Sequence, residues 1–420
     1  MEGSNRRGSC ETRAHTEDAA ILSRQGTQVT RRKLPSGVVA LGFVSLFMDL
    51  SSEMIHSLLP LFLVSVLGAS TLSVGIVEGV AEATASISKI FSGAISDWIG
   101  RRKPLVLLGY GLAALTKPLF PLATGIGSVL FARFVDRIGK GIRGAPRDAL
   151  IADITPPALR GAAYGLRQSM DSVGAFAGPA AALALMALSG DDFRLVFWIA
   201  VVPAFVCIAL IVIGVREPDV ARPVQRRSPI HRDELARLSG RFWLAVAFAA
   251  VLTLARFSEA FLLLRAQDVG LAVTWVPLIL IVMNVAYALS AYPLGRLSDN
   301  GSRGRLLGLG IGFLIAADLV LAQATGTWAV GAGAVLWGLH MGATHGLLTA
   351  IIADAAPADL RGTAFGVFNL ATGLALLAAS VIAGGLWNVF GPATTFYAGA
   401  AFSAVALTGL VMRRDRRKAP

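Results

Sequence analysis

Charged side chains recur at helical spacing between residues 131 and 160, in a stretch that is too long and too little broken to form a loop. This stretch carries five basic residues with two acidic ones between them: Arg133, Arg137, Lys140, Arg143 and Arg147, with Asp136 and Asp148. At about 100° per residue, the five cations occupy roughly a third of a helix circumference. If the helix crosses a bilayer, this basic stripe must line water or pair with carboxylates, because each charge near the bilayer centre costs at least about 2.5 kcal/mol.

An acidic face lies in the first apolar stretch of the chain. Asp49, Glu53 and His56 stand at i, i+4 and i+7, so they share about a sixth of the helix circumference near mid-membrane. Glu78 and Glu82 share a face of the next apolar stretch in the same way. A carboxylate in a cavity whose surroundings change can take up and release protons, and a nearby histidine can relay them. We therefore expect proton coupling at Asp49, Glu53, His56 and Glu82, with Glu53 as the first choice.

The basic stripe is expected to bind carboxylates in one state of the cavity and an anionic substrate in the other. The second half of the chain has Ala334, Gly338 and Met341 at the positions that match Arg133, Arg137 and Lys140, so we expect it to supply cavity walls and substrate contacts. The expected cavity residues are Arg133, Arg137, Lys140, Asn284, Tyr287, His340 and Asn369. Other ionisable residues in apolar stretches are Arg167, Asp171, Arg256, Glu259 and His345. The alternative is that stripe and carboxylates form a buried network of salt bridges that holds the first half together.

Composition predicts the elements that carry these groups. The chain has 420 residues, of which 55% are hydrophobic and only 15% charged, and its mean hydropathy is +0.66. Apolar segments of about 20 residues, the length that spans a hydrocarbon core, recur roughly twelve times between Val38 and Leu410. We therefore predict an all-α membrane protein with twelve transmembrane helices.

The distribution of basic residues predicts the orientation. Arginine and lysine gather in the terminal segments and in the middle of the chain, whereas the short loops near residues 69, 125, 325 and 391 carry none. The positive-inside rule then places both termini and the middle segment in the cytoplasm, as in a multi-pass protein of the inner (plasma) membrane. This accounts for the net charge of +12 through topology and contact with membrane lipid, without nucleic acid. The first residues lack the apolar region of a cleavable signal peptide.

A polar segment with three prolines divides the chain, and an internal repeat supports that division. The sequence IADITPPALRGAAYGL at 151–166 recurs as IADAAPADLRGTAFGV at 352–367. We predict two parallel six-helix bundles, because both halves begin on the cytoplasmic side. The predicted segments are a disordered cytoplasmic tail at 1–35, the first bundle at 36–215, a cytoplasmic linker at 216–240, the second bundle at 241–412 and a basic cytoplasmic tail at 413–420.

A second repeated motif resembles a known family. GAISDWIGRRK from Gly93 recurs as GRLSDNGSRGR from Gly295. The first copy resembles the signature loop between the second and third helices of the major facilitator superfamily, and the second copy is degenerate. The resemblance implies two pseudo-symmetric six-helix bundles around a central cavity, with rocking-switch alternating access. It also implies that charges in this loop latch the halves together, although they could serve topology alone. The gate residues expected from it are Gly93, Asp97, Gly100, Arg101, Arg102, Asp299 and Arg303.

A glycine pattern in the fifth apolar stretch bears on the direction of transport. Gly165, Gly174, Gly178 and Pro179 resemble the fifth-helix motif of proton-coupled antiporters in the same superfamily, which are typically exporters. The chain departs from that motif where Ala182 and Leu183 replace a glycine pair. Helix packing through small residues is the alternative explanation of the pattern.

The sequence therefore predicts a monomeric secondary transporter that exchanges protons for a small organic compound, either anionic or zwitterionic. Within the superfamily, the chain resembles the proton-coupled exporters of drugs and other organic compounds. A proton-symporting importer of an organic anion or metal chelate, or a receptor on a transporter scaffold, is the alternative. No resident metal is expected, because only five histidines are present and none has ligand spacing. No cofactor or enzymatic activity is expected either, since neither a phosphate-binding loop nor a nucleophile–base set is present.

Overall fold

The computed structural model describes residues 34–99, 101–217, 235–300, 303–357 and 360–416. Within these residues the chain forms helices and no strands. The first half contains α2 (Ser36–His56), α3 (Leu59–Leu61), η1 (Phe62–Val66), α4 (Thr71–Ile99), α5 (Lys103–Thr116), η2 (Lys117–Leu119), α6 (Ile126–Ile154), η3 (Pro157–Leu159), α7 (Arg160–Ser189) and α8 (Phe193–Gly214). The second half contains α10 (Gly240–Ala255), α11 (Ala260–Asp268), η4 (Val273–Trp275), α12 (Pro277–Asn300), α13 (Arg303–Ala322), α14 (Thr327–Ala355), α15 (Arg361–Phe390) and α16 (Pro392–Arg416).

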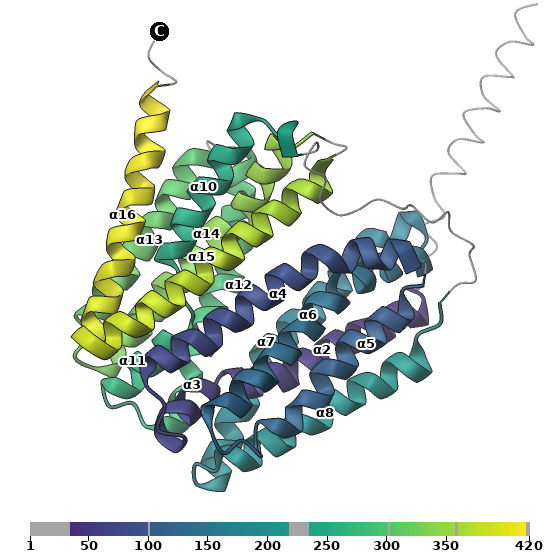
Figure 1. The fold of residues 1–420 in the computed structure, drawn as a ribbon, viewed down its shortest axis with the longest axis horizontal. Coiled ribbons are helices and arrows are strands. Elements are labelled where there is room, and N and C mark those ends of the chain that lie inside the picture. The colour runs from purple at the N-terminus through teal and green to yellow at the C-terminus, as the bar shows by residue number, and fades with distance from the viewer. Residues whose placement is uncertain (1–33, 100, 218–234, 301–302, 358–359, 417–420) are drawn as a thin grey trace, which may run out of the picture.

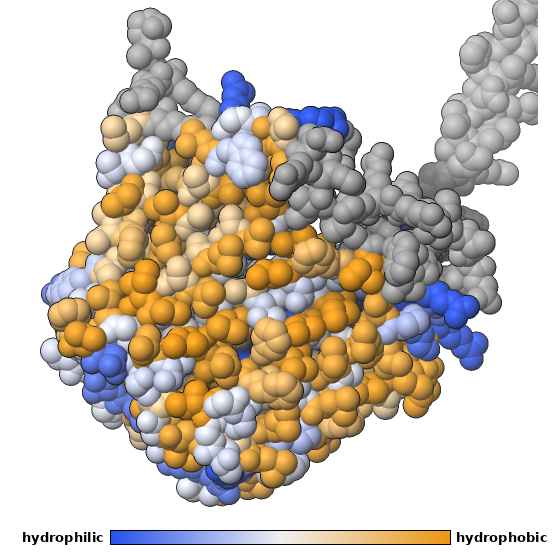
Figure 2. Space-filling model, viewed as in Figure 1, coloured by the Kyte–Doolittle hydropathy of each residue, from blue (hydrophilic) through white to orange (hydrophobic). Residues whose placement is uncertain are grey.

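These helices make twelve spans in the described part of the chain, because α2, α3 and η1 continue one another, as do α10 and α11. Eight spans are long and apolar enough to cross a membrane by composition alone. The other four are α4, α5, α6 and α14; of these, α4 and α6 carry the charged faces described above, and α5 is short. Apolar residues cover most of the visible surface of both bundles, and hydrophilic residues gather at the ends of the helices, which fits a lipid-facing belt (Figure 2). The fold predicted from the sequence is confirmed.

The two halves repeat the same helix pairings. In the first half α4 packs on α6 and α6 on α5, and in the second half α12 packs on α14 and α14 on α13. The halves meet along two seams, α4 with α15 and α7 with α12 (Figure 1). In the first seam the α4 backbone at Gly75 passes so close to the Ser380 carbonyl of α15 that a Cβ would overlap it. Glycine is therefore required there for the bundles to touch.

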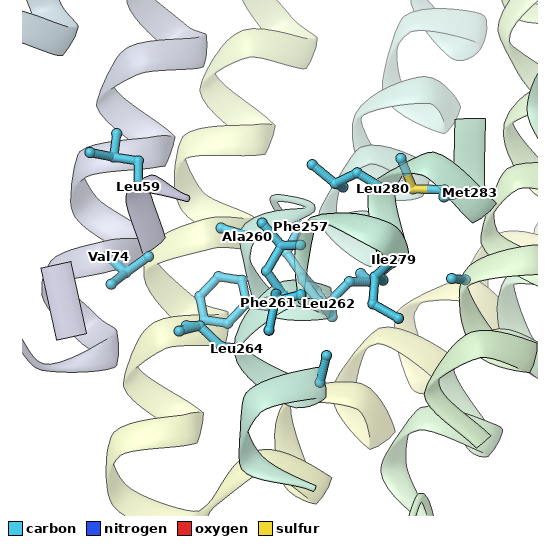
Figure 3. Packing of buried hydrophobic residues seen from close by; sticks show 14 of the residues in the cluster. Leu59, Val74, Phe257, Ala260, Phe261, Leu262, Leu264, Ile279, Leu280 and Met283 are labelled. Atoms are coloured by element: carbon cyan, nitrogen blue, oxygen red, sulfur yellow. The ribbon is translucent and has the colours of Figure 1, made fainter. Parts of the chain in front are cut away.

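The bundles pack most extensively at one end of the molecule and diverge toward the other, although α4 and α15 stay in contact as far as Ile90 and Gly366. We call the end at which α2 begins, α8 ends and α10 begins the proximal end, and the opposite one the distal end. The largest apolar cluster contains residues of both bundles; Figure 3 shows Leu59 and Val74 of the first with Phe261 and Leu264 of the second. The two clusters nearest the proximal end each belong to one bundle. Figure 1 shows the bundles diverging toward that end.

Hydrogen bonds between the bundles follow the same division. Thr71 Oγ1 donates to the Gly384 carbonyl at 3.3 Å, and Gln267 Nε2 donates to Ser65 Oγ at 2.9 Å. The Thr274 hydroxyl donates to the Asp191 carboxylate. All three lie at the distal end, where the short connections between spans meet. The arrangement therefore closes the distal end and leaves the proximal ends of α7 and α12 without such bonds among the described residues.

Candidate transport cavity

A polar cavity lies between the bundles and consists of two pockets that share lining residues. The central pocket, of about 250 Å³, is lined from both bundles. The C-terminal pocket, of about 380 Å³, is lined mainly by the second bundle. Glu82, Arg256 and Leu376 line both pockets, so the two are adjacent and we treat them as one candidate site.

The first two residues of the basic stripe, Arg133 and Arg137, are paired with the carboxylates of α4. Arg133 Nη2 donates to Glu78 Oε2 at 2.7 Å, and both side chains are almost fully buried. One turn further along, Arg137 Nη1 lies 3.3 Å from Glu82 Oε1. Because the cations and the carboxylates are each four residues apart, the two pairs form consecutive rungs between facing helices. His56 Nδ1 lies 3.1 Å from Arg133 Nη2 and completes the first rung.

A lysine that the sequence analysis did not select enters this network. Lys117, in η2, donates to Asp136 Oδ1 at 3.1 Å and to Ser52 Oγ at 3.0 Å. Arg137 Nε lies 3.5 Å from the other oxygen of Asp136. Asp136 thus bridges two cations in the core of the first bundle. The signal for Lys117 was a single charge at the end of the third apolar stretch, but sequence spacing alone does not pair it with Asp136.

The last two residues of the stripe, Arg143 and Arg147, also have partners. Asp148 accepts from Arg147 Nε and from Arg167 Nη1, each at 3.1 Å. Arg167 also pairs with Asp171 one turn along α7. The Arg143 guanidinium lies 4.5 Å from the centre of the Tyr110 ring, a cation–π contact. The salt-bridge network that the sequence left as an alternative therefore includes most of the stripe.

Four charged residues of the central pocket stay outside this network. Glu53 on α2 and Lys140 on α6 come from the first bundle, and Arg256 and Glu259 come from the second. None of the four forms an ion pair with another described residue. Each half of the molecule thus brings to the same cavity one acid and one base that have no ion-pair partner among the described residues.

The glycines of the antiporter-like pattern pack directly behind Glu53. At Gly178 a Cβ would overlap the Cβ of Glu53, and at Gly174 it would crowd the Cβ of Asp49. Glycine therefore lets α7 lie against the acidic face of α2. Asp49 itself lines neither pocket, and Gly165 faces open space. Pro179 lies within α7 without ending it.

The seventh span is broken where it lines the cavity. Helix α10 ends at Ala255 and α11 begins at Ala260, so Arg256, Phe257, Ser258 and Glu259 lie between the two helices. The Ser258 backbone N–H donates to Ser380 Oγ, and the Ala260 N–H donates to Ser258 Oγ, both at 3.3 Å. Hydroxyl groups thus satisfy backbone donors that the helix break releases. Non-helical backbone at membrane depth is tolerated where it lines a cavity, which is its position here.

The other predicted cavity residues divide between lining and supporting positions. Asn284 lines the central pocket and His340 the C-terminal pocket, where His340 Nδ1 lies 2.8 Å from the Gly310 carbonyl. Tyr287 packs on the ring of His345 at 5.7 Å and lines neither pocket. Asn369 and Arg133 also lie outside both linings.

The amino-acid sequence matches the profile of the Major Facilitator Superfamily over residues 41–266 and 254–420. The chain belongs to this superfamily. An uncharacterized MFS-type transporter of Methanocaldococcus jannaschii is 32% identical over 382 residues, which are 89% of this chain and 94% of that protein. The multidrug resistance protein MdtH of Photorhabdus laumondii is 32% identical over 156 residues, 37% of this chain and 38% of that protein. In fold, the crystal structure of the nucleoside transporter NupG matches with a TM-score of 0.75 at 12% identity, covering 89% of this chain and 98% of that one.

The signature loop of this major facilitator superfamily transporter is described only in part. The side chains of Gly93, Asp97, Gly100, Asp299 and Arg303 lie outside the described residues, and Arg101 is exposed. Arg102 Nε lies 3.1 Å from Asp153 Oδ2 on α6. Lys103 Nζ donates to the Val215 carbonyl beyond the end of α8 at 2.6 Å, and Glu217 accepts from the backbone N–H groups of Arg102 and Lys103. These contacts tie α5 to α6 and α8 within the first bundle, and a latch between the halves stays a prediction.

Proposed function

We propose that this membrane transporter is a proton-coupled exporter of small organic compounds, with Glu53 as the proton carrier. The observation that carries the proposal is the position of Glu53: it lines the cavity, has no ion-pair partner among the described residues, and is backed by Gly178 of the antiporter-like pattern. A carboxylate that is not held by a cation can be protonated and deprotonated without breaking the fold. Glu78 and Glu82, which are bound to arginines, lack that freedom.

The charge of the cavity favours a zwitterionic substrate over a purely anionic one. Three of the five cations of the stripe, Arg133, Arg137 and Arg147, are paired with carboxylates of the first bundle, which weakens the main argument for an anion. A positively charged group that approaches Glu53 would compete with the proton there, and such competition is what exchange of substrate for protons requires. Asp49, His56 and Glu82 would then tune Glu53 instead of carrying the proton themselves.

The closed distal end supports loading from the proximal side. Basic residues assign the proximal end to the cytoplasm, so a compound would enter from the cytoplasm and leave after the bundles rock. On the same rule the protein lies in the plasma (inner) membrane with both termini in the cytoplasm. The name of MdtH, a multidrug resistance protein, is consistent with export.

The proposal is tested in everted membrane vesicles that hold an acidic interior and a pH-sensitive dye. We expect some members of a panel of organic cations, zwitterions and anions to release the proton gradient with the wild-type protein and not with Glu53→Gln. Asp148→Asn, the same chemical change outside the cavity, should behave as wild type. Exchange that persists in Glu53→Gln, or a wild-type protein that exchanges no member of the panel, would contradict the proposal.

A second candidate is a proton-symporting importer of organic anions. Arg256 and Lys140, both without a carboxylate partner among the described residues, favour it. In the vesicle assay, symport would move protons in the same direction as the anion, which gives the opposite sign of dye response to exchange.

A further inference from the structure

The C-terminal pocket contains a guanidinium group that no described carboxylate binds directly. Glu82 is the only acidic residue among the described residues of its lining, and that carboxylate pairs with Arg137 at 3.3 Å. Arg256 lines the same pocket and forms no ion pair with a described residue. It therefore brings to a membrane-embedded pocket a positive charge that no described carboxylate binds directly, although Glu82 and Glu259 lie close enough to stabilise it electrostatically. A charge in that position is costly unless a ligand or water offsets it.

A histidine fixes the orientation of this guanidinium. Arg256 Nη1 contacts His345 Nε2. A guanidinium can only donate hydrogen bonds, so His345 Nε2 accepts, and the ring is neutral with its proton on Nδ1. The Tyr287 ring lies edge-on to the imidazole, with ring centres 5.7 Å apart, and holds it in place. One edge of Arg256 is thus occupied, while its remaining N–H groups have no hydrogen-bond partner among the described residues.

The remaining lining of the pocket suits the body of an amphipathic molecule. Leu252, Leu348, Phe368 and Leu376 supply apolar surface. Thr344 also lines the pocket, but its hydroxyl already donates to the His340 carbonyl at 2.8 Å. Arg256 is therefore the principal charged donor that a ligand would meet.

We propose that Arg256 binds a carboxylate group of the transported compound, and that this compound is an organic zwitterion whose amine reaches Glu53. The guanidinium fork matches a planar carboxylate in a two-point contact, whereas a doubly charged phosphate would leave excess negative charge beside a single cation. Arg256 lines both pockets, so a carboxylate bound to it lies beside the pocket that Glu53 also lines. This inference rests on the proposed transport function and names its substrate class.

Equilibrium binding to the purified protein in lipid nanodiscs tests the inference without a proton gradient. The probes are 4-(aminomethyl)benzoate, phenylalanine and 6-aminohexanoate, each compared with its methyl ester, and the readout is the shift in melting temperature with concentration. We expect at least one zwitterion to stabilise the wild-type protein and its ester, which lacks the anionic oxygen, to bind about tenfold or more weakly. Arg256→Gln should weaken the zwitterion to the level of the ester, and Arg256→Lys should give an intermediate affinity, because an ammonium makes a one-point contact.

His345→Ala should weaken binding by a smaller factor than Arg256→Gln, since the charge stays while its orientation is lost. Arg167→Gln, which removes a paired arginine outside both pockets, serves as the control and should leave the affinities unchanged. Equal binding of acid and ester, equal binding by Arg256→Gln, or no binding of any of the three zwitterions would overturn the inference. The ester comparison uses only the wild-type protein, so a variant that fails to fold does not decide the result.

The two proposals can fail separately. If the carboxylate depends on Arg256 but Glu53→Gln still exchanges protons, the zwitterion site survives and the role of Glu53 does not. If Glu53→Gln abolishes exchange of a compound whose affinity does not change in Arg256→Gln, the exporter proposal survives and the carboxylate site does not.

Discussion

The two bundles share a fold and differ in how they treat the charges at the cavity: the first pairs most of them and leaves Glu53 and Lys140 unpaired among the described residues, whereas the second leaves both Arg256 and Glu259 unpaired. In the first bundle Arg133 and Arg137 pair with the carboxylates of α4, and Asp136 bridges Arg137 and Lys117. In the second bundle Arg256 and Glu259 flank a helix break and line the cavity without ion partners among the described residues. Asp318 on α13 is fully buried, and neither of its oxygens has a hydrogen-bond partner there. Internal repetition of a fold therefore does not repeat the chemistry.

The difference teaches which charges are free to act. A buried pair is held by its partner, and a change in either member exposes the other to a medium that cannot solvate it. An uncompensated group in a water-accessible cavity costs less to change and can exchange its proton or bind a ligand. The number of charges in a span is thus a poor guide to function, and the absence of a partner is a better one.

The largest effect is expected from breaking the pair between Arg133 and Glu78. Arg133→Met leaves the Glu78 carboxylate, 1% exposed, without its main cation, and should lower the free energy of unfolding by about 3–5 kcal/mol. Unfolding in mixed detergent micelles measures this loss. The double variant Arg133→Met with Glu78→Leu should recover most of it, because both charges are then gone. A double variant as unstable as the single one would mean that the pair is not the source of the loss.

A smaller effect is expected from separating α7 and α2. Gly178→Ala places a methyl group against the Cβ of Glu53 and the Leu50 carbonyl, and should lower the free energy of unfolding by about 1–3 kcal/mol. It should also impair proton exchange, because Glu53 is displaced. Gly165→Ala is the matched control in the same helix, where a Cβ meets nothing within 4 Å, and should stay within about 0.5 kcal/mol of wild type. If the two substitutions have equal effects, close packing behind Glu53 is not what the glycine provides.

Periodicity in the sequence predicts which residues share a helix face, but not which faces meet. The spacing of Glu78 with Glu82 and of Arg133 with Arg137 fixes two charged faces, and each face could line the cavity or pair with the other. That choice depends on the packing of α4 against α6, which links residues about fifty positions apart and leaves no mark in local spacing. The long apolar spans and the repeat, by contrast, are local or self-similar features, and they predict the fold well.

The broken seventh span was not predictable for a related reason. Proline is the usual local signal for a helix break, yet Pro146, Pro179 and Pro203 lie inside continuous helices. Arg256, Phe257, Ser258 and Glu259 include neither proline nor glycine. The break is instead accompanied by Ser380 on α15, a partner more than a hundred residues away that accepts the Ser258 N–H. Only tertiary contacts identify such a site.

The smallest effect on stability is expected at Glu259. This substitution gives the most direct comparison between an unpaired charge of the second bundle and a paired charge of the first. Glu259→Gln removes a carboxylate that has no ion partner among the described residues, so the free energy of unfolding should fall by less than about 1 kcal/mol. Glu78→Gln, the same substitution at a paired site, should cost several-fold more, because it leaves Arg133 buried without a carboxylate. Both variants are unfolded under identical conditions in mixed micelles. Equal losses in the free energy of unfolding would mean that Glu259 is held as firmly as Glu78. Glu259 would then have a partner in another state of the cavity, and its lack of one here would not be a property of the second bundle. A small loss at Glu259 with a large one at Glu78 would assign a structural role to the paired charges of α4 and α6 and leave the unpaired groups of the cavity, Glu53 and Glu259 among them, free to respond.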